Sequence, residues 1–296
     1  MLHLTKLNEK AIQVRLTRRK VNLSRRDHEA EAFVQQGLND GGATVNRKLF
    51  KDKLNPVNRV IAAFDQLYTV HKAATIRYVD VGPRLIPNAH YMAYASMMRE
   101  KIADLDLMIS RIMPRYDDYV ALDIAYRSQD PSKPVRAKVS DYPTAEDFQA
   151  AMGVELKFSP LPESSHFLFD LSPEDMAAFN KAQTDAIDIA RQDVVSRMLI
   201  PVQHLVSKLA LGIGEPGHIF RDTTFENVLE GLIEAKKLCL DPSAELLDVI
   251  AQLETALGRY SNKVHQLRES PIERSSAHEK LEAIARRMAG FMGASA

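Results

Sequence analysis

The sequence predicts a mainly α chain with a small β component, an α+β fold in which a helical core carries one or two short β-hairpins. Apolar residues recur every three or four positions through most of the chain, which is the period of a helix packed on one face. Strict alternation of apolar and polar residues, the period of a half-buried strand, is confined to short segments. The five regular strands of an OB-fold are not visible, so we expect a different architecture.

The first forty residues predict a strand, a basic turn and a helix. Residues 12–16 alternate apolar and polar side chains, which places Arg15 on the face opposite the apolar one. Residues 18–20 are all basic and predict a turn. The stretch from Ser24 to Asp27 has the spacing of a capping box, so we expect it to open a helix that Gly37 closes.

Two helices separated by a β-rich stretch are predicted next. The first follows Pro56 and extends to about residue 71, and residues 74–90 have the composition of a short strand with a rigid loop. From about Ala89 a longer helix carries an apolar seam, and Pro114 ends or kinks this helix. We expect the seam to pack against another helix. Its members are Met98, Ile102, Leu105, Ile109 and Ile112.

Residues 127–143 contain three prolines and mixed charges, which makes them the best candidate for an interdomain connection or an exposed loop. They would separate a basic N-terminal domain with a helical core, residues 1–126, from a domain with a β-hairpin and helices, residues 144–296. A single continuous domain is the alternative.

The second half of the chain predicts one hairpin followed by helices. Residues 154–158 alternate like a strand, and we expect Phe167 and Phe169 to lie on its hairpin partner. Ser172, followed by proline and two acids, has the strongest features of a helix start, and this helix should extend toward Pro201 or, with a kink there, to Leu211. Later helices are predicted to begin at Thr223, Asp241 and Ser276.

Several classes of function lack their signatures in this sequence. No apolar run has the length of a membrane span and the N-terminus lacks a secretory core, so we expect a cytoplasmic protein, in the host cytoplasm if it is viral. Walker, nucleophile-elbow and zinc-spacing motifs do not occur, so we predict no enzyme, no catalytic residue, no metal and no cofactor. The stretch Gly212 to Gly217 has the glycine spacing of a dinucleotide loop, but a predicted helix precedes it, which favours an interhelix turn.

The distribution of charge is the most informative feature of the chain. Thirteen of its 39 lysine and arginine residues lie in the first sixty residues, together with only six of its 39 acidic residues. This segment therefore has a net charge of about +7 and the remainder about −7, although the whole chain is neutral. A molecule charged in this way can attract phosphates to its basic end.

A single strand of nucleic acid suits this basic end better than duplex DNA, because no helix-turn-helix, zinc finger or basic zipper is visible. A single-strand binder needs a cationic track for phosphates and exposed aromatic faces for bases. The predicted track is Arg15, Arg18, Arg19, Lys20, Arg25, Arg26, Lys48 and Lys51. Phe50 and Tyr78 are the predicted stacking residues. The alternatives are a core position for each ring and an ordinary solvated surface for the track.

Two segments and the helix-rich order of the chain resemble a phage protein family. The segments are RLTRRKVNLSRR and KAATIRYVDVGPRLIPNAHYMAYASMMREKIADLDLMI. Over most of its length the chain is similar to the single-stranded-DNA-binding RNA polymerase cofactors of N4-related bacteriophages, and more loosely to a phage-associated family of unknown function. The resemblance implies binding to locally melted promoter DNA and recruitment of the phage RNA polymerase by a fold other than the OB barrel. It assigns no role to individual residues.

We therefore predict a non-catalytic single-stranded DNA-binding transcription cofactor, whose partners are single-stranded DNA and a phage RNA polymerase. One alternative is a structural or adaptor homo-oligomer without nucleic-acid binding, built through the apolar seam or a C-terminal stripe. The stripe consists of Leu281, Ile284, Met288 and Phe291. The other alternative is a metal-dependent nuclease that uses Glu155 and Lys157, with Asp141 or Asp147 as a second acid.

Overall fold

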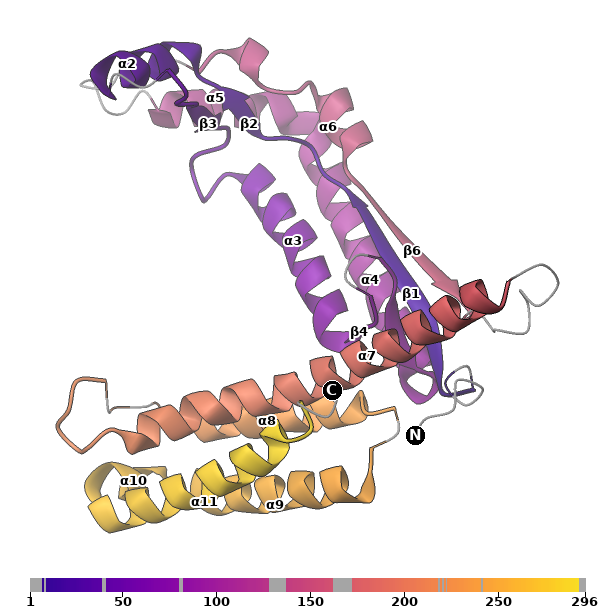
Figure 1. The fold of residues 1–296 in the computed structure, drawn as a ribbon. Coiled ribbons are helices and arrows are strands. Elements are labelled where there is room, and N and C mark those ends of the chain that lie inside the picture. The colour runs from indigo at the N-terminus through magenta and orange to yellow at the C-terminus, as the bar shows by residue number, and fades with distance from the viewer. Residues whose placement is uncertain are drawn as a thin grey trace. The chain divides into compact units, whose positions relative to one another are not determined.

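Helices form most of the chain in the computed structural model, which confirms the mainly α prediction with its small β component (Figure 1). The structure describes residue 7 and residues 9–38, 41–79, 82–127, 137–161, 172–217, 219, 221, 223–240 and 242–292. The strands are β1 (Ala11–Arg19), β2 (Ser24–Arg26), β3 (Asn46–Lys48), β4 (Ile76–Arg77), β5 (Arg84–Pro87) and β6 (Gly153–Ser159). The α-helices are α2 (His28–Leu38), α3 (Pro56–Ala74), α4 (Asn88–Ile112), α5 (Tyr116–Arg127), α6 (Ala145–Ala151), α7 (Pro173–Ala210), α8 (Thr223–Lys237), α9 (Ala244–Ser261), α10 (Val264–Glu269) and α11 (Pro271–Ala289). Two short 3-10 helices are η1 (Met113–Arg115) and η2 (Val139–Asp141).

Two compact units divide the chain, and each has its own hydrophobic core. The helical unit consists of Met1–Arg15, Lys72–Tyr94 and Lys157–Ala296. The hairpin unit consists of Leu16–His71 and Ala95–Leu156. The predicted domains, divided at residues 127–143, stay a prediction.

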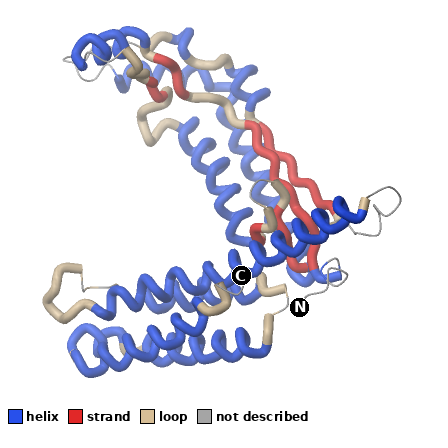
Figure 2. The backbone as a smooth tube through the Cα atoms, viewed as in Figure 1, coloured by secondary structure: helices blue, strands red, loops and turns tan. Residues whose placement is uncertain are grey.

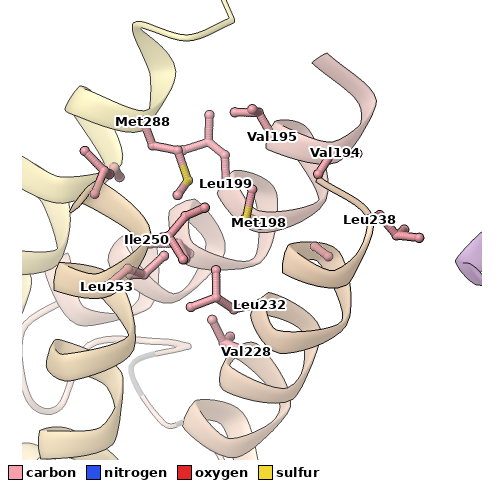
Figure 3. Close-up of a cluster of buried hydrophobic side chains, with 14 of the residues drawn as sticks. Val194, Val195, Met198, Leu199, Val228, Leu232, Leu238, Ile250, Leu253 and Met288 are labelled. Carbon is pink, nitrogen blue, oxygen red and sulfur yellow. The ribbon is translucent and has the colours of Figure 1, made fainter. Parts of the chain in front are cut away.

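Amphipathic helices build the core of the helical unit. α7 packs against α8 and α11, and α9 packs against the same two helices. Figure 3 shows the apolar side chains that meet there, and the labelled ones are Val194, Val195, Met198, Leu199, Val228, Leu232, Leu238, Ile250, Leu253 and Met288. Each fully buried side chain of this size stabilises the fold by about 1.5–3 kcal/mol relative to an exposed one.

The longest helix of this unit begins as the sequence predicts. The Ser172 hydroxyl accepts a hydrogen bond from the backbone N–H of Asp175, and Pro173 occupies the first turn. α7 continues through Pro201 to Ala210. At its other end, the buried side chain of Arg274 donates to backbone carbonyls near the end of α7, and so satisfies acceptors that a helix end leaves open.

A four-stranded sheet has the strand order β4-β5-β1-β6 (Figure 2). β1 pairs with β5 in antiparallel register, with Ala11 opposite Pro87. Arg15 is exposed and its neighbour Val14 is buried, which confirms the predicted alternation. β6 forms where alternation predicted a strand. The expected hairpin partner with Phe167 and Phe169 lies outside the described residues.

The hairpin unit gathers its core from α3, α4, α5 and α6. The largest side chains of this core are Phe50, Phe64, Tyr116 and Phe148. β2 and β3 form a separate two-stranded antiparallel sheet, with Arg25 opposite Arg47. The predicted helix after Pro56 and the break at Pro114 are both confirmed, since α3 begins at Pro56 and η1 separates α4 from α5.

The beginning of the hairpin unit differs from the prediction. Residues 18 and 19 belong to β1 instead of a turn. Ser24–Arg26 form β2, and the carboxylate of Asp27 accepts a hydrogen bond from the N–H of Ala30 at the start of α2. Gly37 lies inside α2. Pairing with β3 decides that this segment is a strand, and the local capping pattern cannot show a partner twenty residues away.

Two later helix starts also differ. α9 is capped by Ser243, whose hydroxyl accepts from the N–H of Leu246, and the predicted start was Asp241. α11 is capped by Ser270 instead of Ser276, and α10 precedes it without having been predicted. In both cases Pro follows or precedes the true cap by one position, which makes the boundary ambiguous in sequence.

The two apolar stripes lie mostly in the interior. Four of the five seam residues of α4 are buried, and so are Leu281, Ile284 and Met288 of α11. Phe291 is partly buried and packs against the core of the helical unit. Among the described helices, none combines the length and the apolarity that a membrane span requires.

Candidate nucleic-acid interface

The loop that links β3 to α3, residues 49–55, is fixed by hydrogen bonds to a buried carboxylate. Asp123 on α5 is fully buried, and its Oδ1 accepts from the backbone N–H groups of two successive loop residues, beginning with Lys51, at 2.6 and 3.3 Å. Its Oδ2 accepts from the Tyr142 hydroxyl at 2.6 Å and from Arg127 Nε at 3.0 Å. These donors compensate a charge that would otherwise be costly to bury.

Side chains next to the loop fix it further. Asn58 Nδ2 donates to the carbonyl oxygen of Phe50 at 2.7 Å and to that of Asp52, and Asn55 Nδ2 donates to the carbonyl oxygen of Tyr119 at 2.9 Å. Phe50 has a φ of 49°, the only positive value among the non-glycine residues that the structure describes. A backbone in this region costs about 1–3 kcal/mol and persists where the surroundings impose it. The loop is therefore rigid and strained.

The phenol in this network stays protonated. Burial raises the pKa of the Tyr142 hydroxyl, and its hydrogen bond to Asp123 acts in the same direction. The hydroxyl is thus a donor to Asp123 throughout the physiological pH range.

Cationic side chains project from the fixed loop. Lys48 at the end of β3, Lys51 and Lys53 are exposed, and none of them forms an ion pair with a residue that the structure describes. Leu54 follows with 74% of its surface exposed. Three lysines that no described carboxylate pairs with and one exposed apolar side chain therefore lie within seven consecutive residues.

One flank of α5 lies beside this loop. Tyr119, Leu122 and Tyr126 recur at spacings of three and four and so share a side of the helix, where Leu122 is 56% and Tyr126 40% exposed. The loop contacts α5 at two points: Asn55 Nδ2 donates to the carbonyl oxygen of Tyr119, and the Arg127 side chain donates to the carbonyl oxygen of Lys48 at the end of β3. We call the following residues the loop–helix surface: Lys48, Lys51, Lys53, Leu54, Leu122 and Tyr126.

Two residues of the predicted track share one carboxylate elsewhere in the hairpin unit. Lys20 Nζ lies 2.8 Å from Asp65, and Arg18 Nη1 lies 3.8 Å from the same side chain. Arg18 also lies over the ring of Tyr68, with its guanidinium carbon 4.1 Å from the ring centroid. This cluster keeps one net positive charge, and packing on the ring fixes Arg18.

The other predicted arginines fall on separate elements. Arg15 and Arg19 are exposed on β1, where Arg15 belongs to the helical unit and Arg19 to the hairpin unit. Arg25 on β2 donates to a backbone carbonyl of η2. Arg26 forms a two-bond ion pair with Glu31. The eight predicted cations are therefore distributed over β1, the β2–β3 sheet and the loop, and only Lys48 and Lys51 belong to the loop–helix surface.

The expectation that Phe50 and Tyr78 are exposed is wrong. Phe50 is fully buried, and its ring packs edge-on against Tyr116 and Tyr142 at centroid distances of 6.0 and 5.2 Å. Tyr78 is 7% exposed in the core of the helical unit, and burial raises the pKa of its hydroxyl. Neither ring has a face open to a base. Phe50 instead anchors the loop whose lysines are exposed.

Folding also redistributes the charge that the sequence segregates. The hairpin unit contains 18 lysine and arginine residues against 17 acidic residues, because the acidic segment 95–156 joins the basic segment 16–71. Arg47 of the basic segment ion-pairs with Asp141 of the acidic segment, which shows how the two segments neutralise each other. A local cluster of unpaired cations, and not a net-positive domain, is what remains for binding an anion.

The acidic residues of the nuclease alternative do not come together in the structure as the ligands of a metal ion would. Asp141 ion-pairs with Arg47, Asp147 accepts from the Thr144 hydroxyl at 2.8 Å, and Glu155 is exposed on β6. Within the described ranges, no group of three or more His, Cys, Asp and Glu side chains is placed to hold a metal ion.

Comparison with known proteins adds no relative: the chain matches no protein-family model, and no curated protein or solved structure is significantly similar to it. The interface is thus defined by this chain's own residues. Sequence reasoning missed Lys53, Leu54, Leu122 and Tyr126. A signal existed for Leu122 and Tyr126, because apolar side chains at i and i+4 beside a separate buried stripe indicate a second, exposed face.

Proposed function

We propose that the chain binds single-stranded nucleic acid through the loop–helix surface of the hairpin unit, without catalysing a reaction. The observation that carries this proposal is the set of three exposed lysines, Lys48, Lys51 and Lys53, on a loop that a buried carboxylate holds in place. Cations without a carboxylate partner attract an external anion, and a polymer of phosphates can contact several at once.

Rigidity supports the same function. Ordering a flexible side chain or loop on binding costs about 0.5–1.5 kcal/mol per immobilised side chain. Here the backbone of the lysine-bearing loop is already fixed by Asp123, Asn58 and Asn55 before any ligand arrives. The backbone of Phe50, which directly precedes Lys51 in the chain, is strained, and strained backbones cluster at binding sites.

The wider role is a transcription cofactor that binds melted promoter DNA and recruits a phage RNA polymerase. The resemblance to the cofactors of N4-related bacteriophages supports this role. It requires a protein-binding surface in addition to the loop–helix surface, and a polymerase pull-down with and without promoter DNA tests it. An apolar oligomer contact has less support, because the seam and the C-terminal stripe are mostly buried.

Salt dependence of binding tests the nucleic-acid proposal. Anisotropy of a labelled oligothymidylate of about 15 nucleotides is measured at several salt concentrations, with the variant K48A/K51A/K53A beside the wild type. Each lost phosphate contact on a single strand makes the log–log slope shallower by about 0.7, so three contacts predict a change of about 2.

The matched control is R99A/K101A/R111A, which removes three exposed cations of α4 from the same unit. These residues also form no ion pair with a described residue, so the change in net charge is identical. The control should leave the slope within error of the wild type. Equal effects of both variants would show that net charge acts without this surface, and a wild type that does not bind would refute the function.

A further inference from the structure

An exposed tyrosine lies on the helix that contacts the lysine-bearing loop of the proposed interface. Tyr126 is 40% exposed in the last turn of α5, and the next residue, Arg127, donates to the carbonyl oxygen of Lys48. Leu122, one turn earlier on the same flank, is 56% exposed. An aromatic ring and an aliphatic side chain thus share an exposed flank of the helix whose last turn contacts the cationic loop.

We propose that Tyr126 is the residue on which an unpaired base stacks, with Leu122 completing the apolar surface. This proposal rests on the nucleic-acid binding proposed above and assigns the base contact within the same site. Charge complementarity selects the occupant: the loop that α5 contacts carries lysines that no described carboxylate pairs with, so a ligand that covers this loop and Tyr126 must be anionic as well as apolar. A single strand offers phosphates and exposed base faces at alternating positions.

The same geometry gives a preference for single strands over duplexes. In a duplex, the base faces are covered by neighbouring bases, and a ring beside the phosphate-binding lysines finds no partner. Affinity for a duplex should therefore come from phosphate contacts alone, whereas a single strand gains a stacking contribution. The ring replaces the two stacking residues expected from sequence, which lie in the protein core.

Two oligonucleotides of equal charge separate stacking from phosphate binding. One is an oligothymidylate and the other is an abasic oligomer of the same length, which keeps every phosphate and lacks every base. The wild type should bind the oligothymidylate more tightly, and Tyr126→Ala should lower that affinity about 5- to 150-fold, the range of one base stack. Affinity for the abasic oligomer and the salt slope should not change. Tyr126→Phe should keep the wild-type affinity.

A fluorescent reporter gives a second readout that does not depend on affinity. The chain contains no tryptophan, so Tyr126→Trp introduces a single one. Stacked thymine should quench its fluorescence, and the abasic oligomer should not. Phe33→Trp is the matched control, since Phe33 on α2 is an aromatic residue of the same unit and is 77% exposed outside the loop–helix surface.

The outcomes distinguish the two proposals. If neither oligomer binds to the wild type, the proposed function fails and the base contact fails with it. If both oligomers bind equally and Tyr126→Ala has no effect, the cationic site stands and stacking on Tyr126 is wrong. If Phe33→Trp is quenched and Tyr126→Trp is not, the base contact lies on α2, which also overturns this inference.

Discussion

The two units of this chain use different means to hold their structure. The helical unit relies on apolar side chains from α7, α8, α9 and α11, and Arg274 is its one buried charged residue among those described. The hairpin unit has a smaller core, and it buries Glu31, Asn55 and Asp123, which hydrogen-bond to neighbouring segments. Apolar packing tolerates many arrangements of similar volume, whereas a hydrogen-bonded carboxylate requires donors at fixed positions.

This difference shows where the chain maintains a specific surface. A well-packed hydrophobic residue at position 123 would stabilise the fold about as well as Asp123, because burying a charge first costs free energy of desolvation. What it does provide is a fixed position for the backbone of Lys51, through hydrogen bonds across 72 residues of sequence. We therefore expect the hairpin unit to lose both stability and binding geometry when this network is changed, and the helical unit to lose stability alone.

The largest expected effect comes from Asp123→Ala. Removing one partner of a buried ion pair costs about 3–5 kcal/mol, because the other partner is left uncompensated, here Arg127. Hydrogen exchange resolved by peptide should show lost protection in the segments 49–55 and 116–127. Asp123→Asn keeps an acceptor oxygen and should cost less. A loss below about 1 kcal/mol for the alanine variant would remove the contrast between the two units.

A somewhat smaller effect is expected for Leu253→Ala in the helical unit. Leu253 is fully buried on α9, so truncation should cost about 2–5 kcal/mol through lost transfer energy and the cavity left behind. Leu247→Ala, on the same helix and 43% exposed, is the control and should change stability by less than about 0.5 kcal/mol. Oligonucleotide affinity should stay at the wild-type value, and a parallel loss of affinity would contradict the assignment of binding to the hairpin unit.

Sequence patterns revealed the parts of this fold that depend on local physics. Helical periodicity, the Ser172 cap and the break at Pro114 are decided within a few residues, and all three are confirmed. β2 was missed because its strand character depends on pairing with β3. Phe50 was expected to be exposed because its sequence neighbours are cationic, but the rings of Tyr116 on α5 and Tyr142, which follows η2, pack against it in space.

The candidate site was harder to predict for the same reason. The cations Lys48 and Lys51 were identified from sequence. Two other predicted cations differ from them because they pair with acids: Arg26 with an acid five residues away and Lys20 with one 45 residues away. No pattern in the segment 46–55 indicates that Asp123 holds its backbone. Charge in sequence therefore predicted the region of the interface, and tertiary partners decide which of its cations remain uncompensated.

A pair of serines tests which boundary of the last helix is real. Ser270 accepts from the N–H of Glu273 at the start of α11, so Ser270→Ala should cost about 0.5–1 kcal/mol. Ser276, the start expected from sequence, is exposed within the helix, and Ser276→Ala should be neutral or slightly stabilising. Chemical denaturation of the two variants measures both values. A larger cost at Ser276 would restore the boundary expected from sequence.

The smallest effect concerns Cys239, the only cysteine, just beyond α8. Burial raises the pKa of its thiol from 9.0 to about 11, against a weaker opposing effect of Lys236. Because the folded state holds the proton more tightly than the unfolded chain, the thiol's contribution to stability is complete below pH 9 and is lost as the pH rises through 11.

At pH 8 the folded thiol should react with a disulfide reagent about 100-fold more slowly than the unfolded one, in proportion to its thiolate fraction. In denaturant at which more than about 1% of the helical unit is open, reaction of the open form exceeds that of the folded thiol, so Leu253→Ala should accelerate labelling there and Leu247→Ala should not. Acceleration by Asp123→Ala would show that the two units unfold together. The two units would then differ in the interactions that hold them, but they would share one free energy of unfolding.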